Sequence, residues 1–229
     1  MFSKLSLSLV GIKQLVALSG LAMVGFLIAH LLGNFLIFSG PVALNSYAHK
    51  LHSLGPILWI MRLGLLFMFL MHFSLVIYLV IVNKKAREHS YTVPIHKKTR
   101  SLFTQTMRYS GLLIFVYIFV HLFDFTFTPH TADNSVIDGV YYGLYGHVYN
   151  YFINPLRSVF YIVTMFAIGF HLIHGVQSVL HTFGFYHQVY TPIIQKISWG
   201  MGAFVAFGFS IIPVYVFLHH HLGWEIYVG

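Results

Sequence analysis

Residues 14–38 read QLVALSGLAMVGFLIAHLLGNFLIF and contain no Asp, Glu, Lys or Arg. A helix needs roughly 20 mostly apolar residues to cross a membrane, because hydrocarbon offers no hydrogen bonds to an open backbone. This stretch therefore predicts a membrane-spanning helix. It carries one ionisable side chain, His30, well inside the apolar run.

Similar stretches follow along the chain, so we predict an all-α integral membrane protein. The five predicted helices lie near residues 14–38, 57–83, 104–128, 156–183 and 193–219. The composition agrees, because 58% of the 229 residues are hydrophobic and 8% are charged, whereas soluble domains carry about 25% charged residues. We find no internal repeat and expect one membrane domain over residues 1–229. The chain has no cysteine, which excludes disulfides, iron–sulfur ligation and thiolate metal sites.

The loop between the second and third predicted helices is the most basic part of the chain. Its cationic residues are Lys84, Lys85, Arg87, Lys97, Lys98 and Arg100, and its one acid is Glu88. The positive-inside rule places this loop in the cytoplasm, and the N-terminus with it. The loop 129–154 carries Asp133 and Asp138 and neither Lys nor Arg, so we expect it outside. The formal net charge of +8 is then mainly an orientation signal, and we expect no binding of nucleic acid.

Histidine is abundant for a chain with so few charges, at 16 copies. Five of these residues fall well inside the predicted helices: His30, His72, His121, His171 and His174. Ionisable groups at this depth are costly and usually face a partner within the helix bundle. A hydrogen bond to a neighbouring helix would explain any one of them. A set that is spread over four helices favours a shared role.

The predicted topology allows the depths of these histidines to be compared. His30 and His121 lie about 8 and about 7 residues from the outer ends of their helices, so at roughly 1.5 Å per residue they share one depth. His72 and His174 lie about 11 and about 9 residues from the inner ends and match within roughly 3 Å. We therefore predict an outer pair, His30 with His121, and an inner pair, His72 with His174. His171 matches the depth of His72 equally well, so spacing does not choose between His171 and His174, which share the predicted helix near 156–183.

Two histidines on separate helices at one depth suit the two faces of a haem iron, because neutral imidazoles can serve as both axial ligands. Two such pairs at different depths would carry electrons across the membrane. A zinc or copper site more naturally gathers three or four ligands at one level. Structural histidines and an ion or proton pathway are the other interpretations of this pattern.

Several short motifs surround these histidines. They are His30-Leu-Leu-Gly-Asn34, Asn45-Ser-Tyr-Ala-His49, His121-Leu-Phe-Asp124, and His171-Leu-Ile-His174-Gly175 with Ser178. Their order and their positions on the helices run along nearly the whole chain. Together they resemble the membrane-anchor cytochrome b subunit of bacterial succinate dehydrogenases and fumarate reductases (succinate:quinone oxidoreductases), of the type that has a single anchor with five helices and two b haems.

The resemblance implies that each of the first four helices supplies one haem ligand, with His30 and His121 on the distal haem and His72 on the proximal haem. The fourth ligand resembles the histidine followed by glycine, which favours His174 over His171. The resemblance also implies a flavoprotein subunit and an iron–sulfur subunit on the cytoplasmic side of a bacterial inner membrane. Electrons would pass through the haems to or from a quinone, for which menaquinone is our expectation. The dicarboxylate site would belong to a partner subunit, and the direction of the reaction stays open.

Other polar residues have weaker functional interpretations. Those that could contact haem propionates, or lipid headgroups, are Arg62, Arg108, Arg157 and His181. Those that could form a quinone or proton-exchange site near the outer haem are Asp124, Tyr47, His49 and His52. Two rival functions remain: the cytochrome b anchor of another quinone-linked enzyme, of the hydrogenase or formate dehydrogenase type, and a haem-free transporter with a histidine relay.

Overall fold

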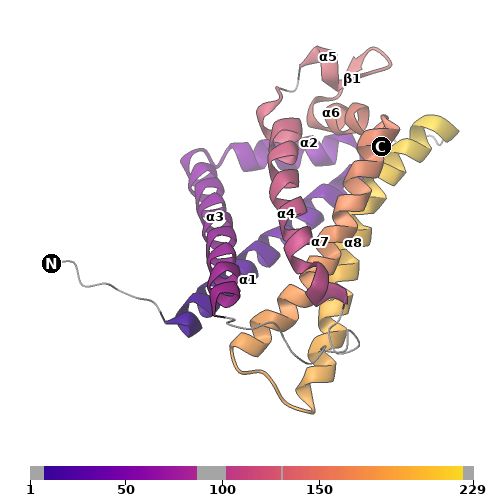
Figure 1. Cartoon of the computed structure of the whole chain (residues 1–229). Coiled ribbons are helices and arrows are strands. Elements are labelled where there is room, and N and C mark those ends of the chain that lie inside the picture. Colours follow the sequence, from indigo (N-terminus) through magenta and orange to yellow (C-terminus); the bar gives the residue numbers. More distant parts are fainter. Residues whose placement is uncertain (1–7, 87–101, 130, 224–229) are drawn as a thin grey trace.

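The architecture is almost entirely helical (Figure 1), in a computed structural model that describes residues 8–86, 102–129 and 131–223. Within these described residues, five helices are long and apolar enough to cross a membrane. They are α1 (Leu9–Asn34), α3 (Pro56–Lys85), α4 (Leu102–Leu122), α7 (Pro155–Thr182) and α8 (Tyr190–Leu222). Their bounds differ from the five predicted ranges by at most six residues, which confirms the prediction of an all-α protein with five helices long and apolar enough to span a membrane.

Local sequence explains where these helices begin and end. Pro56 and Pro155 occupy the first turns of α3 and α7, where a missing backbone N–H costs nothing. The side chain of Asn154 accepts hydrogen bonds from two backbone N–H groups at the start of α7, as expected of an N-cap. Gly223 ends α8 with a left-handed backbone conformation, at φ 66°, which glycine adopts without steric cost.

Two of the long helices continue into tighter or wider turns. A 3-10 helix, η1 (Phe35–Ser39), extends α1, and a π-helix, η3 (Phe123–Phe127), extends α4. The π-helical turn contains Asp124. Such turns occur frequently at functional sites because they change the direction in which side chains project.

One end of the bundle is closed by a layer of short elements, drawn at the top of Figure 1, that we call the cap. It consists of α2 (Pro41–His52), α5 (Ala132–Ser135), the hairpin β1 (Val136–Ile137) and β2 (Val140–Tyr141), and α6 (Gly143–Phe152). Sequence analysis expected a loop over residues 129–154 and placed residues 41–52 between two predicted helices. Asn45 fastens α2 to α6, since its side chain donates to the carbonyl of Tyr142 (2.8 Å) and accepts from the N–H of Tyr145 (3.2 Å).

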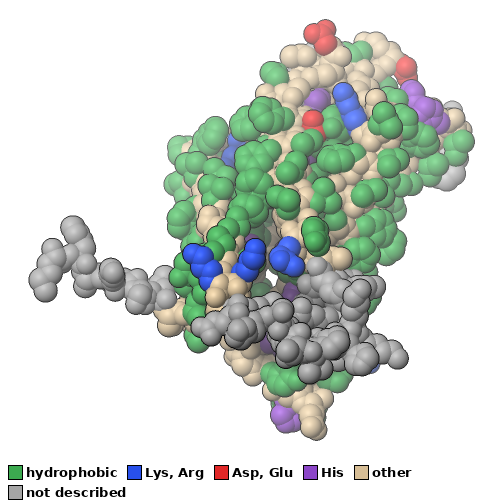
Figure 2. Space-filling view, viewed as in Figure 1, with side chains coloured by type: hydrophobic (Ala, Val, Ile, Leu, Met, Phe, Trp, Pro, Cys, Tyr) green, Lys and Arg blue, Asp and Glu red, His purple; other side chains and the backbone are tan. Residues whose placement is uncertain are grey.

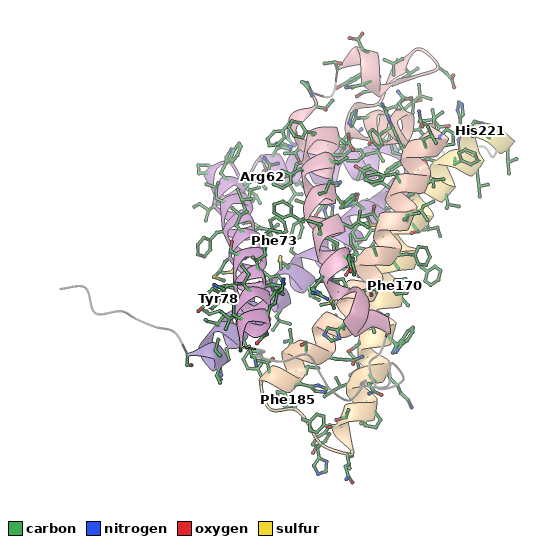
Figure 3. The ribbon with its side chains drawn as sticks, viewed as in Figure 1. Arg62, Phe73, Tyr78, Phe170, Phe185 and His221 are labelled. Carbon is green, nitrogen blue, oxygen red and sulfur yellow. The ribbon has the colours of Figure 1, made fainter. Side chains whose placement is uncertain are left out.

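Packing is uneven across the bundle. Helices α7 and α8 approach closely at Gly169 and Gly202, where a Cβ on either glycine would come within 2.7 Å of the other glycine's carbonyl oxygen. Small residues allow this close contact between membrane helices. By contrast, no side chain of α3 is buried. This helix packs mainly on α1, and Phe73 joins it to α4 by stacking on Phe115, with ring centres 4.0 Å apart (Figure 3).

The two ends of the bundle differ in charge. All the acidic side chains among the described residues lie at or near the cap, as the red atoms at the top of Figure 2 show. Helix α1 begins at the opposite end with Lys13, and α3 ends there with Lys84 and Lys85. Lys4, Glu88 and the remaining basic residues of the 84–100 loop lie outside the described residues, so the cytoplasmic assignment of that loop stays a prediction.

Candidate functional site

Two of the predicted histidines face each other near the cap. His30 lies near the end of α1 and His121 near the end of α4, and their ring centres are 5.9 Å apart with an angle of 80° between the planes. We call them the cap-side pair. The structure thus brings together the two residues that were predicted from depth as the outer pair.

Aromatic side chains hold both rings of the cap-side pair. His30 stacks on Phe26 of its own helix, with centres 5.3 Å apart, and Phe209 of α8 lies 5.7 Å away. His121 stacks in the same way on Tyr117, at 5.6 Å. Nδ1 of His121 is buried without a hydrogen-bond partner among the described residues. Such a buried polar atom needs a partner, and a bound group could supply one.

The spacing of the cap-side pair suits one metal atom. Because a metal–imidazole bond is roughly 2 Å long, a metal ion between two imidazoles would hold the ring centres about 6 Å apart. The observed separation of His30 and His121 is 5.9 Å. The separation of these two rings is therefore of the size that two imidazoles on one haem iron require.

His72 of α3 is fixed through one of its two ring nitrogens. Nδ1 lies 3.1 Å from the hydroxyl oxygen of Ser19 and 3.1 Å from the carbonyl oxygen of Val16, both on α1. A carbonyl can only accept, so Nδ1 must carry the proton. The Ser19 hydroxyl gives its own proton to Leu15 or Val16 carbonyls, at 2.8 and 3.0 Å. In the neutral imidazole, Nε2 of His72 is then left with a lone pair for a ligand.

His171 of α7 is fixed in the same manner by α4. Its Nδ1 lies 3.1 Å from the hydroxyl oxygen of Ser110, and that hydroxyl donates to the carbonyl of Met107 at 3.1 Å. With the hydroxyl proton directed to Met107, the oxygen accepts from Nδ1–H and leaves the Nε2 lone pair of His171 available. His72 and His171 are therefore each contacted at Nδ1 by a serine hydroxyl of a neighbouring helix.

Gly20 follows Ser19 and Gly111 follows Ser110, and these two glycines make room for the rings of His72 and His171. A Cβ on Gly20 would lie 3.3 Å from Cε1 of His72, and a Cβ on Gly111 would lie 3.6 Å from Cε1 of His171. The first distance is tighter than ordinary van der Waals contact. A side chain at Gly20 would therefore push against His72.

The two histidines inside α7, His171 and His174, differ in their neighbours. His171 lies within electrostatic range of His72, while His174 has His181 as its charged neighbour on the same helix. We call His72 and His171, which lie within electrostatic range of each other, the far-side pair; sequence analysis ranked His171 second to His174. His181 lies one to two turns beyond His174 and makes an edge contact with Tyr186, at 5.2 Å between ring centres.

A carboxylate lies beside the cap-side pair. Asp124, in the π-helix, accepts hydrogen bonds from the hydroxyls of Tyr151 (2.5 Å) and Tyr161 (2.6 Å). The Tyr161 ring in turn lies 6.2 Å from that of His121. We call Asp124, Tyr151 and Tyr161 the acid–tyrosine cluster. Sequence analysis singled out Asp124 but neither tyrosine, because they come from distant parts of the chain.

The surroundings of Tyr151 favour the protonated form of its hydroxyl. Burial, together with the hydrogen bond to Asp124, raises the pKa of the Tyr151 hydroxyl, and the nearby Arg157 guanidinium offsets part of this rise. That guanidinium lies over the Tyr151 ring, 4.6 Å from its centre, in a cation–π contact. A hydrogen bond of 2.7 Å from Nε2 of His147 to the backbone carbonyl of Asp124 also holds the π-helix.

The remaining predicted site residues are dispersed. Tyr47 packs against α1 at Gly33, whereas His49 and His52 are exposed on α2. His49 lines a shallow surface hollow of about 520 Å³ with Asn45, Ser46 and Lys50. Arg62 lies over the Trp59 ring at the cap end of α3, 5.3 Å from its centre, and Arg108 is exposed at the other end of the bundle. The structure does not bring these residues into one site.

We compared the chain with protein-family models, with curated proteins and with solved structures. Nothing matches. Among the described residues there is also no group of three or more His, Cys, Asp or Glu side chains that could hold a metal ion. Interpretation of the site therefore depends on the two histidine pairs and the acid–tyrosine cluster.

Proposed function

We propose that this chain is an electron-transferring membrane anchor that binds two b haems, each between two histidines. The observation that carries the proposal is the arrangement of the cap-side pair, whose ring centres are 5.9 Å apart. The far-side pair supports it, because Nδ1 of each ring lies 3.1 Å from a serine hydroxyl oxygen, and donation from Nδ1–H to that oxygen would leave Nε2 for a ligand. Ligand histidines characteristically donate their other ring N–H to an oxygen acceptor in this way.

In this proposal, His30 and His121 hold one haem, and His72 and His171 hold the other. We favour His171 over His174, although the sequence motif favoured His174, because Ser110 fixes the ring of His171 and because His171 lies near His72. On α1, about 11 residues separate His30 from Ser19, the contact of His72. At 1.5 Å per residue the two sites are then roughly 16 Å apart along the helix.

When bound, the haems would supply one-electron transfer between the two sides of the membrane. The chain's own part is to hold them in a dry bundle and to exchange protons near the cap. Asp124 carries out that exchange, since a quinone takes up or releases protons when its redox state changes. Tyr151 and Tyr161 orient the carboxylate by donating hydrogen bonds to it.

The resemblance described above supports the choice of partners. An iron–sulfur subunit would dock at the end opposite the cap and link the far-side haem to a flavoprotein subunit. Menaquinone would react near the cap. This arrangement corresponds to the anchor of a bacterial succinate dehydrogenase or fumarate reductase in the inner membrane, with the N-terminus in the cytoplasm.

A reduced-minus-oxidised optical spectrum of the purified chain tests the proposal, with haem quantified per chain. Two b-type haems per chain are expected, and subunits that purify with the chain would distinguish succinate:quinone oxidoreductase from a hydrogenase or formate dehydrogenase complex. A folded protein that was produced with haem available and contains none would overturn the proposal. That outcome would favour a transporter in which the histidines relay protons or metal ions.

A further inference from the structure

A sequence pattern occurs twice, once in α1 and once in α4. Ser-Gly-Leu begins at Ser19 in α1 and at Ser110 in α4. Seven residues after the serine stands an aromatic residue, Phe26 in α1 and Tyr117 in α4. Eleven residues after the serine the dipeptide His-Leu begins, at His30 and at His121. Sequence analysis found no internal repeat, because the intervening residues differ.

The contacts of the two copies are also alike. In each helix the aromatic residue stacks on the histidine one turn later, as Phe26 does on His30. In each helix the serine hydroxyl lies 3.1 Å from Nδ1 of a histidine on a neighbouring long helix. Helices α1 and α4 therefore each carry one histidine of the cap-side pair and hold one histidine of the far-side pair.

We infer that Ser19 and Ser110 are positioning residues for the far-side haem, which they influence by fixing the Nδ1–H tautomer of His72 and His171. This inference rests on the proposed function. A hydrogen bond from Nδ1–H to an oxygen makes the opposite nitrogen a more basic ligand. A more basic ligand stabilises the oxidised iron over the reduced iron, so the two serines lower the redox potential of the far-side haem.

The two serines contribute unequally. His72 keeps the carbonyl of Val16 as an acceptor when the Ser19 hydroxyl is removed. For His171, the hydrogen-bond partner of Nδ1 among the described residues is Ser110. Loss of the Ser110 hydroxyl therefore has the larger effect, because it leaves a buried N–H without an acceptor.

Redox titration of both haems in the purified full-length protein, followed optically, tests this inference. The variants are Ser19→Ala, Ser110→Ala and Ser110→Thr. Ser198→Ala serves as the matched control, because Ser198 is buried in α8 and its hydroxyl bonds to its own helix at the carbonyl of Ile194. We expect a positive shift of the far-side potential in Ser110→Ala, a smaller one in Ser19→Ala, and unchanged potentials in Ser110→Thr and Ser198→Ala.

Several outcomes decide the question. A far-side potential that stays unchanged in Ser110→Ala would overturn the inference, and so would an equal shift of both haems. If Ser110→Ala instead loses the far-side haem alone while Ser110→Thr retains it, the positioning role is supported. A wild-type protein without haem would overturn the proposed function itself, which separates that failure from a failure of the serines.

Discussion

The hydroxyl of Tyr161 donates a hydrogen bond of 2.6 Å to the carboxylate of Asp124. The two residues belong to different helices, and the same tyrosine ring lies beside His121, 6.2 Å away. The Asp124 carboxylate lies close to the proposed haem ligand His121. It is held in one position by the Tyr161 hydroxyl, which cannot replace it as a base. This arrangement gives Asp124 a role that can be separated from haem binding.

Asp124→Asn should slow electron transfer to or from quinone while both haems remain bound. The amide keeps the size of the side chain but cannot exchange a proton, and loss of a positioned acid–base group lowers rates by on the order of 100-fold. Stopped-flow reduction of the haems by a menaquinol analogue measures the effect. Asp133→Asn is the control, because Asp133 is an exposed carboxylate of the cap. Equal rates in wild type and Asp124→Asn would remove Asp124 from the proton path.

His121→Ala should remove the cap-side haem and leave the far-side haem in place. Each pair draws its ligands from two helices, and His121 belongs to the cap-side pair alone. Haem content per chain, together with the low-temperature spectrum, should show half the wild-type haem. His49→Ala, at an exposed position on α2, should retain both haems. If a folded His121→Ala protein keeps two haems, the pairing is incorrect.

His171→Ala and His174→Ala should differ in haem content. Ser110 of α4 contacts Nδ1 of His171, and His171 lies within electrostatic range of His72, so we expect the loss of His171 to delete the far-side haem and the loss of His174 to leave it. The same spectra measure both variants, and each variant is the control for the other. Loss of the far-side haem in His174→Ala, with the haem retained in His171→Ala, would restore the ligand that the glycine motif favoured.

Gly202→Val should destabilise the bundle through the contact between α7 and α8. A Cβ at this position would lie 2.5 Å from Cγ1 of Ile173 and 2.6 Å from the carbonyl oxygen of Gly169, so the helices must separate. Overpacking of this kind costs about 1–3 kcal/mol. Thermal unfolding in detergent measures the change. Gly200→Val is the matched control, because a Cβ there meets no atom within 4 Å, and equal stability of the two variants would contradict the prediction.

The long helices and the cap-side pair could be predicted from sequence because both depend on simple patterns. Charge-free length sets the five spans, and depth along straight helices brings His30 opposite His121. The inner pair was harder, since His171 and His174 lie less than one turn apart and depth cannot separate them. The contact on which our preference for His171 rests is the hydroxyl of Ser110, which belongs to another helix and has no sequence pattern that links it to His171.

The helices and the hairpin of the cap were also not predicted from the sequence, for a different physical reason. Its helices α2 and α6 are short, and α6 is buried largely through aromatic residues such as Tyr145 and Tyr149, which resemble membrane-interface residues in a linear sequence. Burial raises the pKa of both tyrosine hydroxyls, so they behave as part of a core. The partners Tyr151 and Tyr161 of Asp124 depend on this fold of the cap and could not be placed without it.

Helix α3 contributes His72 yet buries none of its side chains against the rest of the chain. It is held by partly buried contacts with α1 and by the Phe73–Phe115 stack on α4, and in the proposed function a haem bound at His72 would link it to α7 as well. If the chain binds haem as proposed, chains made without the cofactor would lack this link, and α3 would be held by its contacts with α1 and α4 alone. Under the proposed function, cofactor supply would then affect how firmly the bundle is assembled, as well as electron transfer.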